Sequence, residues 1–292
     1  MSDNLGGLTQ LGDGKIDTCG GLIGSSISVL LQGEYRMDTP VNGVLLIGGS
    51  MLFSVAGLLL VRRYVDIDWL KRHHEVASYF FLMIGTLYAV LVAFAIFVVW
   101  SNFKDAGTNL EHEATEVADL SRLSTAMPDP YRKNVSVALM EYLNAVAQDE
   151  FPAMAQGRDS QRTWDAVQKL WDIYGAFRPE TPQMQVYLTE SLKHLTLLSD
   201  FRRTRLFTSR GTVPVTLWCL LVSGGILLIA FTYFFGHESV WSQASMTAAL
   251  AGILAFSLFL IFSMDSPYSG VSQVTPRAFQ VELVHVAARM PK

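Results

Sequence analysis

The sequence predicts an all-α protein that crosses a membrane four times and carries an extramembrane helical domain between the second and third crossings. Half of the 292 residues are hydrophobic, only 16% are charged, and the mean hydropathy is +0.30. Soluble domains usually carry about 25% charged residues. The deficit is local, because four windows contain no Asp, Glu, Lys, Arg or His: residues 43–61, 78–100, 212–236 and 246–264.

Each window has the length of a membrane-spanning helix. The windows run from 19 to 25 residues, which at a rise of about 1.5 Å per residue matches a hydrocarbon core about 30 Å thick. A helix in a soluble core shows an apolar stripe rather than an apolar circumference. The windows also lack the alternation of strands, so helices rather than barrel strands are predicted.

Residues 1–42, before the first window, form a polar segment rich in Gly and Ser. Its one apolar stretch, Leu22–Leu31, is too short to span a membrane. Two interpretations stay open: the segment is disordered, or it lies along the membrane interface or over a neighbouring subunit. Its acidic start lacks the basic residues that open a secretory signal.

Residues 43–100 are expected to hold the first two membrane helices. The loop between them, Arg62–Glu75, contains Tyr64 and Trp69, which suit the headgroup layer. The second crossing ends at Trp100, another aromatic residue of the kind that marks a membrane interface.

Residues 101–211 are expected to form the helical domain. From Ala106 onwards, apolar residues recur at spacings of three and four residues. Acidic residues lie between them: Glu111, Glu113, Glu116 and Asp119. Asp129-Pro130 and Thr181-Pro182 look like helix starts, with a capping side chain ahead of a proline at the first helical position. The domain helix that begins near Lys104 continues almost directly from the second crossing.

Residues 212–264 are expected to hold membrane helices 3 and 4, and residues 265–292 a C-terminal tail with a short amphipathic stretch near 279–286. The positive-inside rule counts Lys and Arg near the ends of the crossings. The count favours an inner-membrane protein with a cytoplasmic domain. Arg62-Arg63 is the counter-argument, because the first crossing often sets the topology.

Several short motifs in fixed order resemble a known family. They are His74–Ala77, Gly85–Leu91 with Trp100, Glu113-Ala114 ahead of Leu120, Glu150–Pro152, Arg202–Leu206, Pro214 with Leu217-Trp218, Phe231–Gly236 and Asp265–Gly270. Together, over residues 43–282, they resemble the DUF4239 or bestrophin-like domain family of bacterial membrane proteins. The chain departs from that pattern at Phe151, where tryptophan is expected, and in its long polar N-terminus.

The resemblance implies kinship with bestrophins, which are pentameric anion channels with four membrane helices and cytoplasmic helices. It therefore implies a homo-oligomeric ion channel, a pentamer if bestrophin-like, that conducts small inorganic ions such as chloride. The alternative is a non-conducting membrane sensor or scaffold whose helical domain binds a partner or ligand.

The second crossing carries the residues most relevant to conduction. Gly85, Ala89 and Ala93 recur every fourth residue and are expected to pack helices closely. Larger residues on an adjacent face are expected to line an apolar neck if several copies surround an axis: Phe80, Ile84, Tyr88 and Leu91. The competing interpretation is that all of these are ordinary packing and lipid-facing residues.

A basic cluster precedes the third crossing. Its members are expected to bind anions or acidic lipid headgroups: Arg202, Arg203, Arg205 and Arg210.

Other classes of function are disfavoured. The crossings hold no titrating side chain, which argues against a proton-coupled transporter or an intramembrane protease. Common catalytic and cofactor motifs are absent, so no enzyme and no cofactor are predicted. The net charge of −4 disfavours nucleic acid. A metal site is not predicted either, because the two candidate clusters, 73–75 and 111–113, flank opposite ends of one crossing.

Overall fold

The described part of the chain is built from helices. The computed structural model describes residues 40–65, 67–235, 239–270 and 272–290, with the backbone alone for 67–76. Within these ranges the regular structure is helical throughout, which confirms the predicted all-α fold. The described residues belong to one compact unit, Asp38–Lys292. The predicted polar segment 1–42 falls almost wholly outside the described residues.

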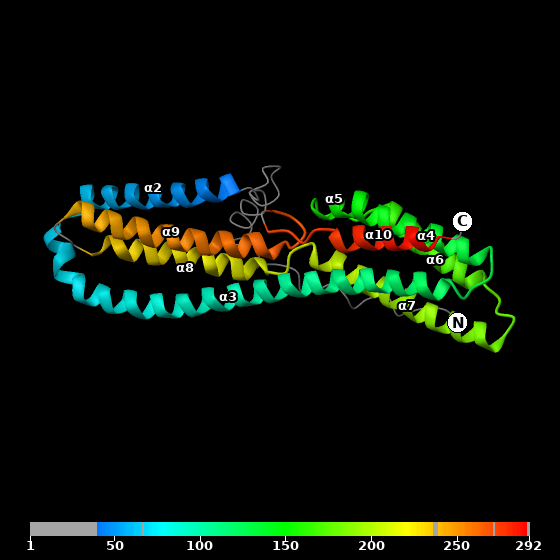
Figure 1. The fold of residues 1–292 in the computed structure, drawn as a ribbon. Coiled ribbons are helices and arrows are strands. Elements are labelled where there is room, and N and C mark those ends of the chain that lie inside the picture. Colours follow the sequence, from blue (N-terminus) through cyan, green and yellow to red (C-terminus); the bar gives the residue numbers. More distant parts are fainter. Residues whose placement is uncertain (1–39, 66, 236–238, 271, 291–292) are drawn as a thin grey trace, which may run out of the picture. The chain divides into compact units, whose positions relative to one another are not determined.

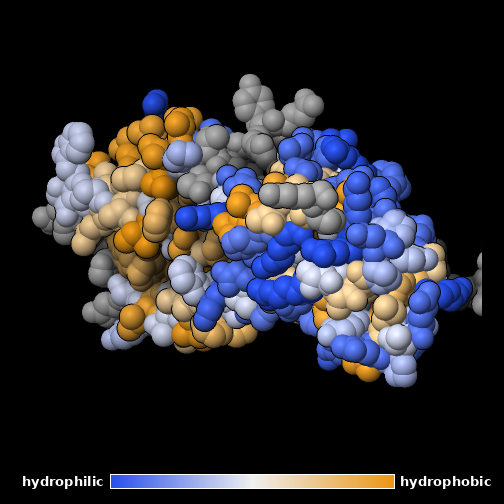
Figure 2. All heavy atoms as spheres, turned by 45° about the vertical axis from the view of Figure 1, so that its right-hand side comes forward, coloured by the Kyte–Doolittle hydropathy of each residue, from blue (hydrophilic) through white to orange (hydrophobic). Residues whose placement is uncertain are grey.

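Four helices are long and apolar enough to cross a membrane: α2 (Pro40–Tyr64), α3 (Ile67–Ser124), α8 (Val215–Tyr233) and α9 (Val240–Asp265). They coincide with the four charge-free windows and confirm a protein with four membrane helices. Helix α9 packs against α2, α3 and α8, and α3 packs against α8 (Figure 1). Hydrophobic side chains gather on the surface over these helices, whereas the surface over the domain is mostly hydrophilic (Figure 2).

Helix α3 is continuous from the membrane into the domain. It has 58 residues, which corresponds to a length of about 87 Å. The predicted boundary between residues 100 and 101 therefore lies inside one helix. The membrane half of α3 packs on α8 and α9, and the other half packs on α4, α7 and α10. A single helix thus connects both parts of the protein.

The helical domain contains α4 (Tyr131–Ala145), a π-helical turn η1 (Val146–Glu150), α5 (Phe151–Met154), α6 (Gln161–Ala176), α7 (Pro182–Thr208) and α10 (Arg277–Arg289). Two starts are capped by side chains: the hydroxyl of Ser160 accepts a hydrogen bond from the Thr163 amide, and Thr181 accepts one from Met184. The predicted start at Thr181-Pro182 is therefore confirmed. Helix α4 instead begins at Tyr131 with Pro130 as its N-cap.

The end of the chain belongs to the domain core. Helix α10 packs against α3 and α4, and Phe279 and Val286 are completely buried there. The predicted amphipathic stretch of the C-terminal tail is the apolar face of this helix. Buried leucines from α4, α6 and α7 complete the same core: Leu139, Leu143, Leu170, Leu195 and Leu198.

Candidate functional site

The membrane half of α3 has one face inside the protomer and one face outside. Phe80, Leu87 and Phe94, at seven-residue spacing, are 53%, 64% and 64% exposed. Seven residues are almost two helical turns, so these three side chains lie in one row. The outer face of α3 is therefore apolar and available to lipid, to another subunit or to a pore.

The structure divides the four residues predicted to line a neck. Phe80 lies on the outer face. Tyr88 is buried inside the protomer, and Ile84 and Leu91 pack against the same internal cluster between α3 and α8. In this conformation Tyr88 is a packing residue. The lining of a neck by these residues stays a prediction, because an apolar helix gives no sign, in its own sequence, of which side its neighbours occupy.

Two tyrosine–glycine contacts hold the membrane helices together. The Tyr88 hydroxyl donates to the Leu221 carbonyl oxygen at 2.8 Å, and a Cβ at Gly224 would lie 2.6 Å from its ring. Between α8 and α2, the Tyr233 hydroxyl donates to the Ser54 carbonyl oxygen at 3.0 Å. A Cβ at Gly57 would lie 2.6 Å from the same hydroxyl oxygen. A Cβ at either glycine would force the tyrosine to shift, so each pair sets the spacing of two helices.

The predicted small-residue stripe is only partly used within the protomer. A Cβ at Gly85 would stand 3.7 Å from the Leu228 side chain on α8, an ordinary contact distance. Ala89 and Ala93 are exposed. Their role in packing helices from different subunits stays a prediction.

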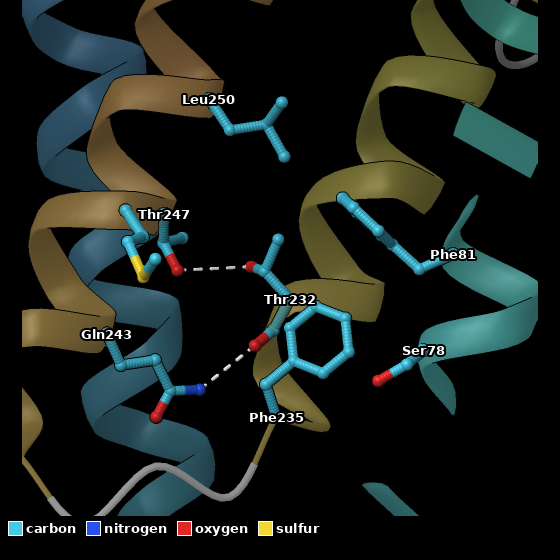
Figure 3. A pocket seen from close by; sticks show the side chains of 8 residues that line it. Ser78, Phe81, Thr232, Phe235, Gln243, Thr247 and Leu250 are labelled. Carbon is cyan, nitrogen blue, oxygen red and sulfur yellow. Dashed lines mark hydrogen bonds between the residues drawn. The ribbon is translucent and has the colours of Figure 1, made fainter. Parts of the chain in front are cut away.

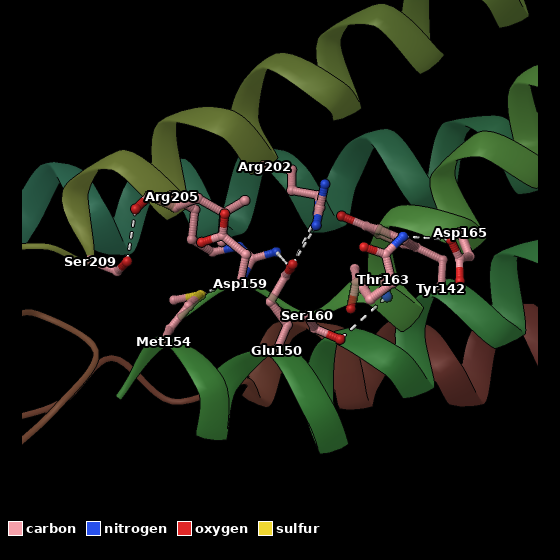
Figure 4. A network of polar contacts seen from close by, with 12 residues as sticks. Tyr142, Glu150, Met154, Asp159, Ser160, Thr163, Asp165, Arg202, Arg205 and Ser209 are labelled. Atoms are coloured by element: carbon pink, nitrogen blue, oxygen red, sulfur yellow. Dashed lines mark hydrogen bonds and ion pairs between the residues drawn. The ribbon is translucent and has the colours of Figure 1, made fainter. Parts of the chain in front are cut away.

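A network of two carboxylates and two guanidinium groups lies in the core of the domain (Figure 4). Arg205 on α7 donates to Glu113 on α3 at 2.7 and 2.9 Å and to Glu150 on η1 at 2.6 Å. Arg202 donates to Glu150 through its Nε at 3.2 Å and forms a second contact through Nη2. All four side chains are at most 3% exposed. The network ties α3, η1 and α7 to one another.

Aromatic and sulfur groups complete the surroundings of this network. The Tyr142 hydroxyl donates to Glu113, and Arg205 Nη1 donates to the Met154 sulfur at 2.9 Å. The Arg202 guanidinium lies 4.5 Å from the centre of the Trp164 ring, a cation–π distance. Two positive and two negative charges therefore balance in a dry environment.

The electrostatics of the network shift the pKa values of Arg205 and Tyr142. Burial alone lowers the pKa of Arg205, but Glu113 and Glu150 raise it, and the result lies well above its ordinary value. Burial and the charge of Glu113 raise the pKa of Tyr142 well above its ordinary value, while Arg205 opposes that shift. Tyr142 consequently stays protonated and acts as a hydrogen-bond donor to Glu113.

The structure separates the predicted basic cluster into two kinds of arginine. Arg202 and Arg205 are enclosed by carboxylates, so they do not present charge to an anion or a lipid headgroup. This corrects the prediction for those two residues. Arg203 and Arg210 are exposed and make long contacts of 3.3 Å with Asp200 and Asp159. Anion or headgroup binding by these two stays a prediction.

A carboxylate joins the membrane helices at the edge of the domain. Asp265, at the end of α9, accepts hydrogen bonds from the amides of Thr212 and Val213 at 2.8 and 2.9 Å, just before α8 begins. A negative charge is favourable at the N-terminal end of a helix. Asn102 on α3 donates to the Thr212 hydroxyl at 2.9 Å. The motif at Asp265–Gly270 thus links α9, α8 and α3.

The residues considered for a metal site have other partners where they are described. His112 stacks on Phe201 with ring centres 5.3 Å apart, and Glu113 belongs to the buried network. Glu116 contacts His194 Nδ1 at 2.6 Å. The side chains of residues 73–75 lie outside the described part of the chain.

Sequence reasoning missed the carboxylates that neutralise Arg202 and Arg205. A signal was present, because both arginines continue the apolar stripe of α7 that contains Leu195 and Leu198. A charged residue at a core position requires a partner of opposite charge. Glu150 likewise follows the buried positions of α4.

Comparisons with known proteins place this arrangement in a family. The family model described as the Bestrophin-like domain matches residues 48–279. Comparison with curated proteins finds no match.

Two crystal structures have a similar fold. A membrane protein variant has a TM-score of 0.65 and 10% identity, covering 84% of this chain and 99% of its own. A variant of a bacterial bestrophin homologue from Klebsiella pneumoniae has a TM-score of 0.58 and 14% identity. The match covers 84% of this chain and 98% of the homologue's chain. The family match covers most of the chain, and the fold agrees with it. The chain therefore belongs to the Bestrophin-like domain family.

Proposed function

We propose that several copies of this chain assemble around an axis and form an ion channel, with the outer face of α3 lining an apolar neck. The observation that carries the proposal is the continuity of α3, whose apolar outer face in the membrane extends into a domain held by buried charges. No enzymatic step is part of the proposal. Conduction of anions, chloride among them, is its finer part and rests on the kinship with bestrophins.

The proposed neck uses the row Phe80, Leu87 and Phe94. Phe80 belongs both to this row and to the neck predicted from the sequence. The row does not include Tyr88, Ile84 and Leu91, because these residues pack within the protomer. An apolar constriction can control ion flow by excluding water, so a charged lining is not required. Ala89 and Ala93 are exposed on other sides of α3 and are suited to close contact with a helix of a neighbouring copy.

The purified full chain, reconstituted in planar bilayers with a chloride gradient, tests the proposal. We expect discrete single-channel currents whose reversal potential follows the chloride gradient. A reversal potential that follows the cation gradient would contradict anion selectivity but would still support an ion channel. Silence over a wide range of voltages and ions would contradict conduction and favour the non-conducting sensor or scaffold.

Truncation of the proposed neck gives a residue-level prediction. Leu87→Ala widens the apolar row at its middle, so we expect a change in conductance or open probability in single-channel recordings. Leu60→Ala on α2 is the matched control, because Leu60 is also an exposed leucine in a membrane helix. If Leu87→Ala and the unmodified chain gave equal currents, the proposal that this face of α3 lines the pore would be contradicted.

Orientation is a separate prediction, with the helical domain in the cytoplasm. We expect a membrane-impermeant maleimide to label Ser239→Cys on intact cells and to label Gln156→Cys only after lysis. Both positions are exposed, and the background is a chain with Cys19 and Cys219 replaced by serine. Labelling of Gln156→Cys on intact cells would reverse the topology.

A further inference from the structure

A cavity of about 410 Å³ lies among α3, α8 and α9, close to the loop that joins α8 and α9 (Figure 3). This volume is in the range of about 300–1,000 Å³ that is usual for small-molecule sites. The lining residues come from membrane helices and from the residue Phe235 just after α8, and the exposed residue among them, Met246, is apolar. The described residues of the cavity hold no acidic or basic side chain, which makes an ionic ligand inside it unfavourable.

The polar side chains at one end of the cavity satisfy one another. Gln243 Nε2 donates to the Thr232 carbonyl oxygen at 2.9 Å, and the hydroxyls of Thr247 and Thr232 are 3.2 Å apart (Figure 3). Arg62 donates to Gln243 Oε1 at 2.6 and 3.1 Å. Gln243, Thr232 and Thr247 are more than nine-tenths buried, and Ser78, the fourth polar residue of the lining, is half-buried. A polar guest would find few free partners here, so water is a poor occupant.

The lining along α9 becomes apolar with depth, and Phe235, just after α8, adds an aromatic ring near the polar end (Figure 3). Gln243, Thr247 and Leu250 lie on one face of α9, and seven residues separate the first from the last, or about 10 Å along the helix. Phe81 and Phe235 meet edge to face with ring centres 5.3 Å apart. The polar end lies near the start of α9 and the apolar end deeper in the bilayer, which is the polarity profile of a lipid.

We propose that this cavity binds a single acyl chain of a membrane phospholipid, with the headgroup phosphate at the level of Arg62. An empty apolar space would forfeit the dispersion contacts of its walls. A hydrocarbon chain restores those contacts without needing a hydrogen-bond partner. The guanidinium of Arg62, half-buried and bonded to Gln243, places positive charge at the polar end, which attracts a phosphate group. Met246, 71% exposed in the lining, provides a mouth toward the bilayer.

The test uses the full chain in vesicles that contain a phosphatidylcholine with a photoactivatable acyl chain, followed by peptide mapping. We expect adducts on the cavity residues to saturate as the fraction of probe lipid rises. Adducts on the outer surface should rise in proportion to the probe, because bulk lipid exchanges freely there. Saturation therefore distinguishes a site from general lipid contact.

Met246→Trp should plug the mouth and reduce the saturable adducts several-fold. Its matched control is Ile253→Trp, on the same face of α9 two turns deeper, outside the cavity and 65% exposed. Both positions are exposed, so both variants should fold and elute like the unmodified chain. Adducts that rise in proportion to the probe, no adducts in the cavity, or equal loss in both variants would each overturn the proposal.

Discussion

Replacing Arg205 by methionine is expected to destabilise the protein by about 3–5 kcal/mol, because it leaves buried carboxylates without their counter-charge. Arg205 is completely buried and contacts both Glu113 and Glu150. Glu150 keeps Arg202, but Glu113 keeps only the Tyr142 hydroxyl. Chemical denaturation of the full chain in mixed micelles, followed by far-ultraviolet circular dichroism, measures the change.

Two further variants make this prediction specific. Arg203→Met removes an arginine of the same helix whose side chain is 77% exposed, and it should change stability by no more than about 0.5 kcal/mol. Glu113→Gln combined with Arg205→Met removes one charge of each sign, so the double variant should be more stable than Arg205→Met alone. If Arg205→Met were as stable as Arg203→Met, the network would not hold the domain together.

Replacing Tyr88 by alanine is expected to cost about 3–5 kcal/mol, as large-to-small changes of buried aromatic residues do. The Tyr88 ring fills the space over Gly224 between α3 and α8. Apolar surface gains little from leaving lipid, so most of the loss comes from the cavity and the missing packing contacts. The same denaturation measurement detects it.

Tyr88→Phe separates the ring from the hydroxyl. This variant keeps the packing and loses only the hydrogen bond to Leu221, so we expect a loss of about 0.6 kcal/mol, the average for such bonds between membrane helices. Phe94→Ala is the control for truncation, because Phe94 is an exposed aromatic residue on the same helix. If Tyr88→Ala had normal stability but altered ion selectivity, the result would indicate that Tyr88 lines the pore and does not serve mainly in packing.

The membrane helices could be predicted because their signal is compositional. A run of 19 or more uncharged apolar residues has few alternatives to a membrane helix. Helices α2, α3, α8 and α9 each contain most or all of one window, and α3 continues beyond its window into the domain. Which side of each helix faces its neighbours was not predictable in the same way. Tyr88 was assigned to a neck from its place near Phe80, whereas its position depends on Gly224, which lies 136 residues later in the sequence.

In the domain, the apolar pattern could be predicted from the sequence but the pairing of charged residues could not. The apolar stripe from Ala106 onwards predicted the buried side of α3 in the domain, but the same pattern places Glu113 among the acidic residues between apolar positions. The structure instead places Glu113 on the inner side of α3, opposite Arg205. Pairing between residues 92 positions apart depends on how α3 and α7 pack, which no local pattern contains. For the same reason the sequence alone predicts that Arg202 and Arg205 bind anions or lipid headgroups.

Electron cryo-microscopy of the full chain in lipid nanodiscs tests the central claim most directly. We expect a closed ring of identical subunits, fivefold if the kinship with bestrophins extends to assembly, with Phe80, Leu87 and Phe94 of α3 facing the axis. A monomer, or a ring in which α2 or α9 faces the axis while the outer face of α3 contacts lipid, would contradict the account.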